Sequence, residues 1–388
     1  MVACLGVAVL ASPSAAAATP SAWQAPGYDA GKSFWDSAEV TVTPARAAAL
    51  KLNFTIPAPP DLNPFPDPGY DCMNPIPPVT AAGRLFDSGQ NGISAYNQWS
   101  GARLWNIPQN QAYGDVNNTA QMQVSGANLV VVLSDCVSNT SAASRVLVRN
   151  AATGAPVVPD WFIDAGTASF SVVNNIVVTS LYSDDTEYVI AYDLSGHLLW
   201  QMNEVSGAGA WRGGLVSSGG LVFVYTIGQT YSQTTAVRVS DGSVAWSTGA
   251  FASFAPLAVS QDGRDLYLAG PNATLETVNP LTGAFGSISA AGRSGPFAAV
   301  DATTVYTSCA GTALCATRRS NGTSMWTIGV GAPCQPVVAV GVVYCAGKVF
   351  RATTGKRIRS AVDGVPVTAV SGGRVYGLLT SGAVASYK

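Results

Sequence analysis

The sequence predicts an all-β protein, a β-propeller of eight four-stranded blades that a strand from the N-terminal region closes. Seven blades is the alternative, depending on how strands at the two chain ends are assigned. Two repeated patterns and the lack of helical apolar periodicity after residue 20 support this fold. A repeat of roughly 40 residues that carries about four short strands is typical of propeller blades, whereas helical solenoids of similar period lack such strands.

The first pattern is a turn glycine followed, after three residues, by tryptophan. It occurs four times, at Gly101 and Trp105, Gly196 and Trp200, Gly242 and Trp246, and Gly322 and Trp326. Three further copies keep the turn glycine but lack the tryptophan, at Gly154, Gly283 and Gly355. In all seven copies the preceding residue is Ser, Thr, Asp or Asn, whose side chains bond the backbone of their own turn. We therefore expect hairpins in which glycine supplies the positive φ.

The second pattern is a short run rich in Val, Leu and Tyr behind a small polar turn, and it alternates with the first. The eight runs lie at 85–86, 129–133, 176–178, 221–224, 266–268, 305–306, 343–344 and 375–376. We expect each to be a strand of one blade.

The four repeated tryptophans, at the ends of the predicted outer strands, are expected to fill the wedge between neighbouring blades. A large flat ring suits this position, and the indole N–H would bond a carbonyl group. Five tryptophans lie outside the repeat and would suit stacking of a sugar or a cofactor better: Trp23, Trp35, Trp99, Trp161 and Trp211. Even for these, burial between blades is the favoured interpretation.

The turn, Gly-xxx-Trp and the preceding Ala191-Tyr192-Asp193 resemble the repeat of PQQ-like propellers, the quinoprotein alcohol dehydrogenase-like superfamily. The resemblance covers about residues 79 to 388. In the catalytic members it implies a quinone and a calcium ion on the axis, an Asp base and usually a disulfide between adjacent cysteines. This chain has no adjacent cysteine pair and no acidic residue at the matching positions. The resemblance thus implies the non-catalytic branch, which uses the propeller as a docking surface, with no catalytic, cofactor-binding or metal-binding residues.

The N-terminal region is predicted to hold a signal, a lead-in and a closing strand. Residues 2–11 are apolar and 15–18 are small, which resembles a secretory signal (1–18), although no Lys or Arg precedes the apolar run. A disordered Ala-rich segment is the alternative. Residues 19–78 would then contain a mobile lead-in to about residue 37, a closing strand and a Pro-rich linker, before the propeller at 79–388. The linker, 57–78, could instead be a recognition peptide.

The closing strand is predicted at 50–56, because Leu50, Leu52, Phe54 and Ile56 alternate with polar residues. The last unit, 366–388, is one strand short, and an unpaired sheet edge invites association. Residues 40–43 are the second choice for the missing strand.

Six cysteines remain once Cys4 leaves with the signal: Cys72, Cys136, Cys309, Cys315, Cys334 and Cys345. An even number favours disulfides in a secreted protein, although six cysteines allow 15 pairings. Cys309 with Cys315, and Cys334 with Cys345, flank predicted turns and could face each other, which would leave Cys72 with Cys136. These spacings and the single histidine, His197, do not suit a zinc site.

Charge and composition narrow the function. The net charge is -2 and only 11% of residues are charged, so neither nucleic acid nor an anionic membrane is an expected partner. No stretch after the signal approaches the length of a membrane span. Five sequons are glycosylation candidates, at Asn53, Asn117, Asn139, Asn272 and Asn321.

The sequence thus predicts a secreted, monomeric and non-catalytic propeller that binds a protein or glycan partner through rim loops, without a cofactor. The alternatives are a quinone-dependent oxidoreductase, which is less favoured, and a glycan-binding or glycan-active propeller.

Overall fold

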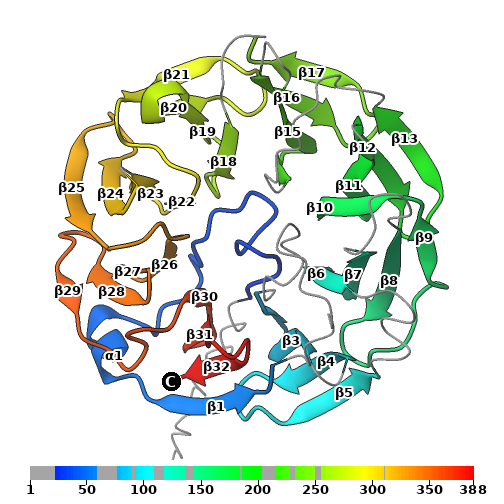
Figure 1. Cartoon of the computed structure of the whole chain (residues 1–388), viewed down its shortest axis with the longest axis horizontal. Helices are drawn as coiled ribbons and strands as arrows, with labels where there is room; N and C mark the ends of the chain where they lie inside the picture. The colour runs from blue at the N-terminus through cyan, green and yellow to red at the C-terminus, as the bar shows by residue number, and fades with distance from the viewer. Residues whose placement is uncertain are drawn as a thin grey trace, which may run out of the picture.

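Eight four-stranded antiparallel sheets stand around a central axis and close into a ring (Figure 1). The computed structural model describes residues 22–58, 77–89, 92–108, 118–135, 143–183, 186–202, 215–227, 232–249, 255–309 and 311–388. The predicted all-β propeller is confirmed, with eight blades and not seven. The predicted signal, 1–18, and most of the predicted linker lie outside the described residues.

Each blade is a meander whose strands run in order from the axis to the outside. Blade 1 consists of β2 (Val79–Ala81), β3 (Arg84–Gly89), β4 (Gly92–Asn97) and β5 (Arg103–Ile107). Blade 2 consists of β6 (Asn118–Ser125), β7 (Asn128–Asp135), β8 (Ser144–Asn150) and β9 (Trp161–Ile163). Blade 3 consists of β10 (Gly166–Val173), β11 (Ile176–Ser183), β12 (Thr186–Asp193) and β13 (Leu198–Met202). Blade 4 consists of β14 (Val216–Ser218), β15 (Leu221–Ile227), β16 (Ser232–Arg238) and β17 (Val244–Ser247).

The other half of the ring repeats this order. Blade 5 consists of β18 (Ala255–Val259), β19 (Leu266–Gly270), β20 (Thr274–Val278) and β21 (Phe285–Ala290). Blade 6 consists of β22 (Ala298–Val300), β23 (Thr304–Cys309), β24 (Ala313–Arg318) and β25 (Ser324–Gly329). Blade 7 consists of β26 (Val337–Ala339), β27 (Val342–Cys345), β28 (Lys348–Arg351) and β29 (Arg357–Ile358). Blade 8 consists of β30 (Val367–Ser371), β31 (Arg374–Leu378), β32 (Val384–Tyr387) and, outermost, β1 (Leu52–Ile56).

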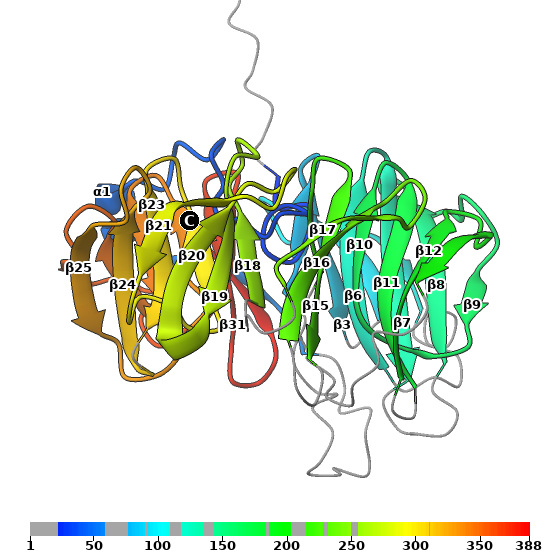
Figure 2. The ribbon, with the colours of Figure 1, turned by 90° about the horizontal axis from the view of Figure 1, so that it is seen from above.

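Helix is confined in the described residues to α1 (Pro44–Ala49) and the 3₁₀ turn η1 (Pro271–Ala273). Thr43 caps α1, because its Oγ1 accepts a hydrogen bond from the N–H of Arg46 at 3.3 Å, and Pro44 takes the first helical position. Figure 2 shows the ring from the side, with α1 on the upper face. No helix among the described residues has the length and apolar character that a membrane crossing requires.

The predicted closing strand is confirmed, since β1 pairs antiparallel with β32 and completes blade 8. Its expected alternation is only partly correct. Ile56 is buried, but Leu52 is 57% exposed. The register shifts between Leu52 and Phe54, and a bulge of this kind turns the residues before it onto another face.

The hydrophobic core is divided among the gaps between blades. One cluster joins Val79 and Phe86 of blade 1 to Met122 and Leu129 of blade 2, and the next five gaps have clusters of the same kind. The cluster of blades 7 and 8 also includes Trp23 from the N-terminal region. Each blade is therefore held mainly by its neighbours.

Two disulfides lie in neighbouring blades. Cys309 and Cys315 join β23 to β24 in blade 6, with 5.9 Å between their Cα atoms. Cys334 and Cys345 join the segment before β26 to the end of β27 in blade 7, with 5.5 Å between their Cα atoms. Cys72 and Cys136, the third expected pair, lie outside the described residues.

Candidate functional site

Residues 22–39, here called the axial segment, run across the inside of the ring (Figure 1), toward the face that is uppermost in Figure 2. That face is the turn rim, which carries the turns between the first and second strands and between the third and fourth strands of the blades. Its inner turns lie at 82–83, 126–127, 174–175, 219–220, 260–265, 301–303, 340–341 and 372–373. The axial segment therefore lies where a cofactor or ligand would have to bind to use the axis from this rim.

Seven of the eight blades bond the axial segment. Five inner-strand amides each donate to a carbonyl of this segment at 2.7–2.9 Å. The pairs are Val124 with Gln24, Ser217 with Ala30, Val259 with Gly31, Val300 with Ser33, and Val338 with Phe34. Thr80 donates its N–H to the Trp23 carbonyl at 2.7 Å, and Gly373 donates to the Glu39 carboxylate at 2.7 Å. Inner strands have an edge with no strand partner, so these bonds satisfy groups that would otherwise face the axis.

The axial segment is also held by its own side chains. Trp23, Ser33 and Asp36 are fully buried, and the Trp23 ring packs edge-on against Tyr28 with ring centroids 5.4 Å apart. Asp29 accepts hydrogen bonds from the Ser33 N–H and hydroxyl at 3.0 and 2.8 Å. Burial raises the pKa of Asp29 and lowers the pKa of Lys32 to about 8. The segment is a packed part of the fold.

The expectation of a mobile lead-in to residue 37 is therefore wrong for residues 22–37. The sequence did not predict the packing of this segment, because its contacts are made by backbone carbonyls, which require no periodic pattern of side chains. Tyr28, Lys32 and Phe34 have positive φ values of 83°, 51° and 51°, so no regular strand or helix could form there.

Tryptophan rings of the outer strands pack against turn glycines of the following blade. Each indole N–H also donates to a backbone carbonyl of the following blade, at 2.7–3.2 Å. The pairs are Trp105 with Ala151, Trp200 with Val239, Trp246 with Pro280, and Trp326 with Ala352. A Cβ added to Gly154, Gly242, Gly283 or Gly355 would lie 2.6–3.0 Å from these rings. The structure thus places all four repeated tryptophans between blades, where the ring needs glycine opposite it.

Trp161 occupies the same position in blade 2, which the sequence pattern did not reveal. Its ring lies on Gly196, and its N–H donates to the Leu194 carbonyl at 3.1 Å. The spacing from Gly154 to Trp161 is longer than in the other copies, so this tryptophan does not fit the Gly-xxx-Trp pattern. Phe54 of β1 takes this position against Gly101, and Ile288 lies against Gly322.

Replacement of Gly242 by Ala tests this packing. Gly242 and Gly126 both have positive φ, 73° and 58°, but an added Cβ at Gly242 meets the Trp200 ring at 2.8 Å, whereas at Gly126 nothing lies within 4 Å. Gly126→Ala should cost only the backbone strain, about 1–2 kcal/mol. Gly242→Ala should lower the free energy of unfolding by about 1–3 kcal/mol more. Thermal melting of the two variants measures the difference, and equal melting temperatures would contradict the packing role.

The remaining predicted residues lie apart from the axis. Asn272 and Asn321 are exposed in turns, while the Asn53 amide donates to the Trp99 carbonyl at 3.0 Å. Asn117, Asn139 and Trp211 lie outside the described residues. Exposed His197 pairs with Asp193 at 2.8 Å, and the described part of the chain brings no three His, Cys, Asp or Glu side chains together in a metal-binding arrangement.

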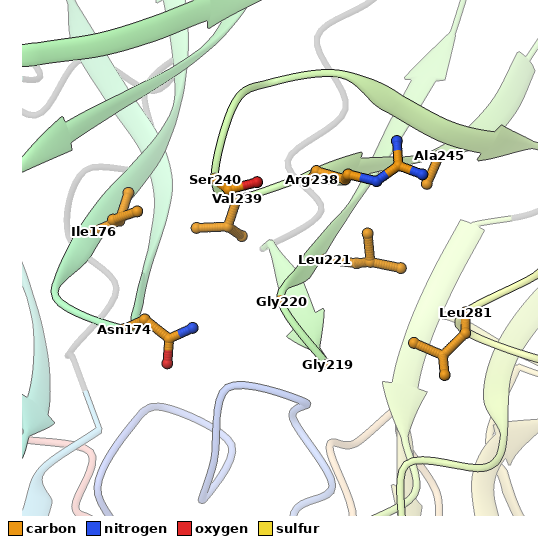
Figure 3. Close-up of a pocket in the computed structure, with 10 residues that line it drawn as sticks. All are labelled: Asn174, Ile176, Gly219, Gly220, Leu221, Arg238, Val239, Ser240, Ala245 and Leu281. Carbon is orange, nitrogen blue, oxygen red and sulfur yellow. The ribbon is translucent and has the colours of Figure 1, made fainter.

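A cavity of about 410 Å³ opens on the turn rim between blades 3, 4 and 5 (Figure 3). Asn174, Ser240 and Leu281 come from three different turns around it. Arg238 points toward Ala245 and away from Asn174, and its guanidinium donates to the Ser243 hydroxyl at 3.1 Å. The polar groups do not converge on one point, so the cavity resembles a groove for contact and not a catalytic centre.

Comparison with known proteins identifies a matching family model and solved structures of similar fold. A family model described as outer membrane protein assembly factor BamB matches residues 185–285. BamB from Moraxella catarrhalis has a similar structure, with a TM-score of 0.63, 14% identity and coverage of 87% of this chain and 99% of that chain. Quinohemoprotein alcohol dehydrogenase from Comamonas testosteroni has a TM-score of 0.66 and 14% identity over 94% of this chain and 80% of that chain. No curated protein sequence matches the chain.

A europium-containing methanol dehydrogenase is similar as well, with a TM-score of 0.62 and 11% identity over 92% of this chain and 89% of that chain. The protein therefore has the PQQ-type propeller fold that its repeat predicts, a fold shared by an outer membrane protein assembly factor and by quinone-type dehydrogenases.

Proposed function

We propose that the protein is a secreted, non-catalytic propeller scaffold that binds a protein or glycan partner through its turn rim. One observation carries the proposal: the chain's own residues 22–39 occupy the axis behind this rim and bond six of the eight inner strands and an inner turn of blade 8. A ligand could use that space only after these bonds were broken. The rim surface around the axis is then the part of this face that remains accessible to a partner.

Two further observations support the proposal. The match to a family described as an outer membrane protein assembly factor favours a scaffold with a protein partner. The two disulfides are typical of proteins in oxidising compartments, such as the extracellular space or the periplasm.

A quinone-dependent oxidoreductase is the rival function, because quinohemoprotein alcohol dehydrogenase has the same fold. The two functions differ in what they require of the axis. A dehydrogenase needs an open site that receives both the quinone and the substrate, whereas a scaffold gains rigidity from a filled one.

The rival functions are separated by adding pyrroloquinoline quinone and calcium to the purified full chain. We expect neither saturable binding of the quinone at micromolar concentration nor reduction of a dye with alcohols or sugars as substrates. Titration calorimetry and dye absorbance measure the two, with a quinoprotein alcohol dehydrogenase as positive control. Saturable binding accompanied by turnover would overturn the scaffold function.

A further inference from the structure

Blades 8 and 1 meet on the turn rim at a group of side chains that the other blades do not have. Its members are Trp99, Arg84 and Arg374, here called the seam site. Trp99 comes from the outer turn of blade 1, and the two arginines begin the second strands of blades 1 and 8. The internal repeat provides a control, because each residue has counterparts at the same position in other blades.

The counterparts show that the fold does not require these residue types. In the five other outer turns of the same length, the position of Trp99 is occupied by Ala152, Ser240, Leu281, Ser320 and Thr353. The second strands of the other six blades begin with Asn128, Ile176, Leu221, Leu266, Thr304 and Val342. Only at this seam do two arginines and an aromatic ring replace small, apolar or neutral polar residues.

Trp99 is fixed as a rigid and half-open platform. Its backbone N–H donates to the Asn97 side-chain oxygen at 2.9 Å, and its ring lies on Gly83, where an added Cβ would be 2.5 Å from the ring. The side chain nevertheless remains 42% exposed. An aromatic ring that is held on one side and open on the other can stack a flat apolar surface at little entropic cost.

Both arginines are anchored in the same way, by a backbone carbonyl of the turn that precedes each of them. Each folds back on its own turn, Arg84 toward the Ala82 carbonyl at 3.0 Å and Arg374 toward the Gly372 carbonyl at 3.4 Å. Arg374 also donates to the Trp99 carbonyl at 3.0 Å. These bonds fix where the two guanidinium groups lie.

Charge at the seam is not neutralised locally. Neither arginine forms an ion pair with a carboxylate of the described residues, and the Nε groups of both are buried without a hydrogen-bond partner there. The neighbouring carboxylate, Glu39, is buried and already accepts three backbone N–H groups. Burial, and to a smaller extent the charge of Arg46, lower the pKa of Arg374.

The buried amide of Gln98 adds an independent observation. Gln98 precedes Trp99 and is fully buried, yet neither of its side-chain polar atoms has a hydrogen-bond partner in the described structure. Its amide nitrogen lies beside Gly372, whose carbonyl accepts the hydrogen bond from Arg374. Buried polar groups are normally bonded, so the unpaired amide and the unpaired Nε groups mark the seam as a place where bonding is incomplete.

We propose that the seam site binds an acidic saccharide, with a sugar ring stacked on Trp99 and a carboxylate or sulfate group bonded to Arg84 and Arg374. Guanidinium groups match the planar carboxylate and the sulfate oxygens, and a single platform suits one or two sugar rings. A nucleic acid strand would need several stacking rings along a basic track. This inference rests on the proposed binding function and specifies the ligand class of the rim.

The test measures binding of defined oligosaccharides to the full chain by titration calorimetry. The probes are an oligogalacturonate, a heparin-derived oligosaccharide, neutral maltohexaose and poly-glutamate. We expect an acidic saccharide to bind and the neutral one not to bind. Trp99→Ala and Arg84→Gln should each weaken binding by about tenfold or more, as expected for central contacts. Among the described residues Arg84 bonds its own turn alone, so its replacement leaves the described contacts between the two blades in place.

Matched controls come from the repeat itself. Thr353→Ala changes the position of Trp99 in blade 7, and Arg103→Gln removes an exposed arginine from the outer strand of blade 1. Both should leave affinity within about twofold, because rim substitutions away from a contact have small effects. The inference is overturned if no acidic saccharide binds, if poly-glutamate or maltohexaose binds equally well, or if the site and control variants bind alike. In those cases an axis that still excludes quinone would leave the scaffold function standing.

Discussion

A chain that begins at residue 40, and so lacks the axial segment, is expected to melt far below the full chain or to fail to fold. The deletion exposes the inner edges of six blades and removes the carboxylate that Gly373 bonds, and each lost backbone bond costs about 0.5–1.5 kcal/mol net. It also removes Trp23 from the core that joins blades 7 and 8. Circular dichroism during heating measures the change.

A point substitution tests the same idea in a chain that keeps every backbone bond. Trp23→Ala should lower the free energy of unfolding by about 3–5 kcal/mol, because the ring is fully buried. Gln24→Ala is the matched control, since that side chain is exposed, and it should change stability by less than about 0.5 kcal/mol. A shortened chain that melts like the full one, or a Trp23 variant as stable as the Gln24 variant, would show that the axial segment is not structural.

The ring could be predicted from the sequence because its determinants are local and repeated. A tight turn requires glycine at positive φ, and a ring packed on the next turn requires that the glycine have no Cβ. Both requirements recur in six of the eight blades, so they produce a period. The closing strand was found for a related reason, since the count of strands left blade 8 incomplete.

Features that depend on a single irregular event were not predictable. Three more residues before Trp161 moved it out of the repeat spacing, although it packs on Gly196 like the others. A bulge in β1 turned Leu52 to solvent against the expected alternation. The axial segment is bound mainly through its backbone carbonyls, which every residue possesses, so its side chains gave no pattern that predicts its position.

The seam site also combines a feature that the sequence could predict with one that it could not. The sequence marked Trp99 as lying outside the repeat, which is a local property. Its contact with Arg374 joins residues 275 positions apart and appears only after β1 has closed the ring. The closure brings together residues from both ends of the propeller, so the spacing of residues in the sequence could not predict a candidate site at this place.

Removal of the closing strand β1 is expected to have the second large effect. A chain that begins at Ala58 lacks β1 as well as the axial segment, so β32 becomes an unpaired edge and Ile56 no longer covers the blade 8 core. An open edge next to apolar surface pairs readily with a second copy. We therefore expect this chain to self-associate as its concentration rises, whereas the full chain retains β1 and stays monomeric. Sedimentation velocity distinguishes the two.

Two substitutions in the full chain separate the closure from the loss of the axial segment. Ile56 is 2% exposed, so Ile56→Ala should lower the free energy of unfolding by about 2–5 kcal/mol. Thr55 is its exposed neighbour in the same strand, and Thr55→Ala should have an effect below about 1 kcal/mol, within the range of strand propensities. A peptide of residues 48–58 added to the chain that begins at Ala58 should suppress association by supplying the missing strand. Monomers of that chain at all concentrations, or no difference between the two substitutions, would mean that β1 is not what closes the ring.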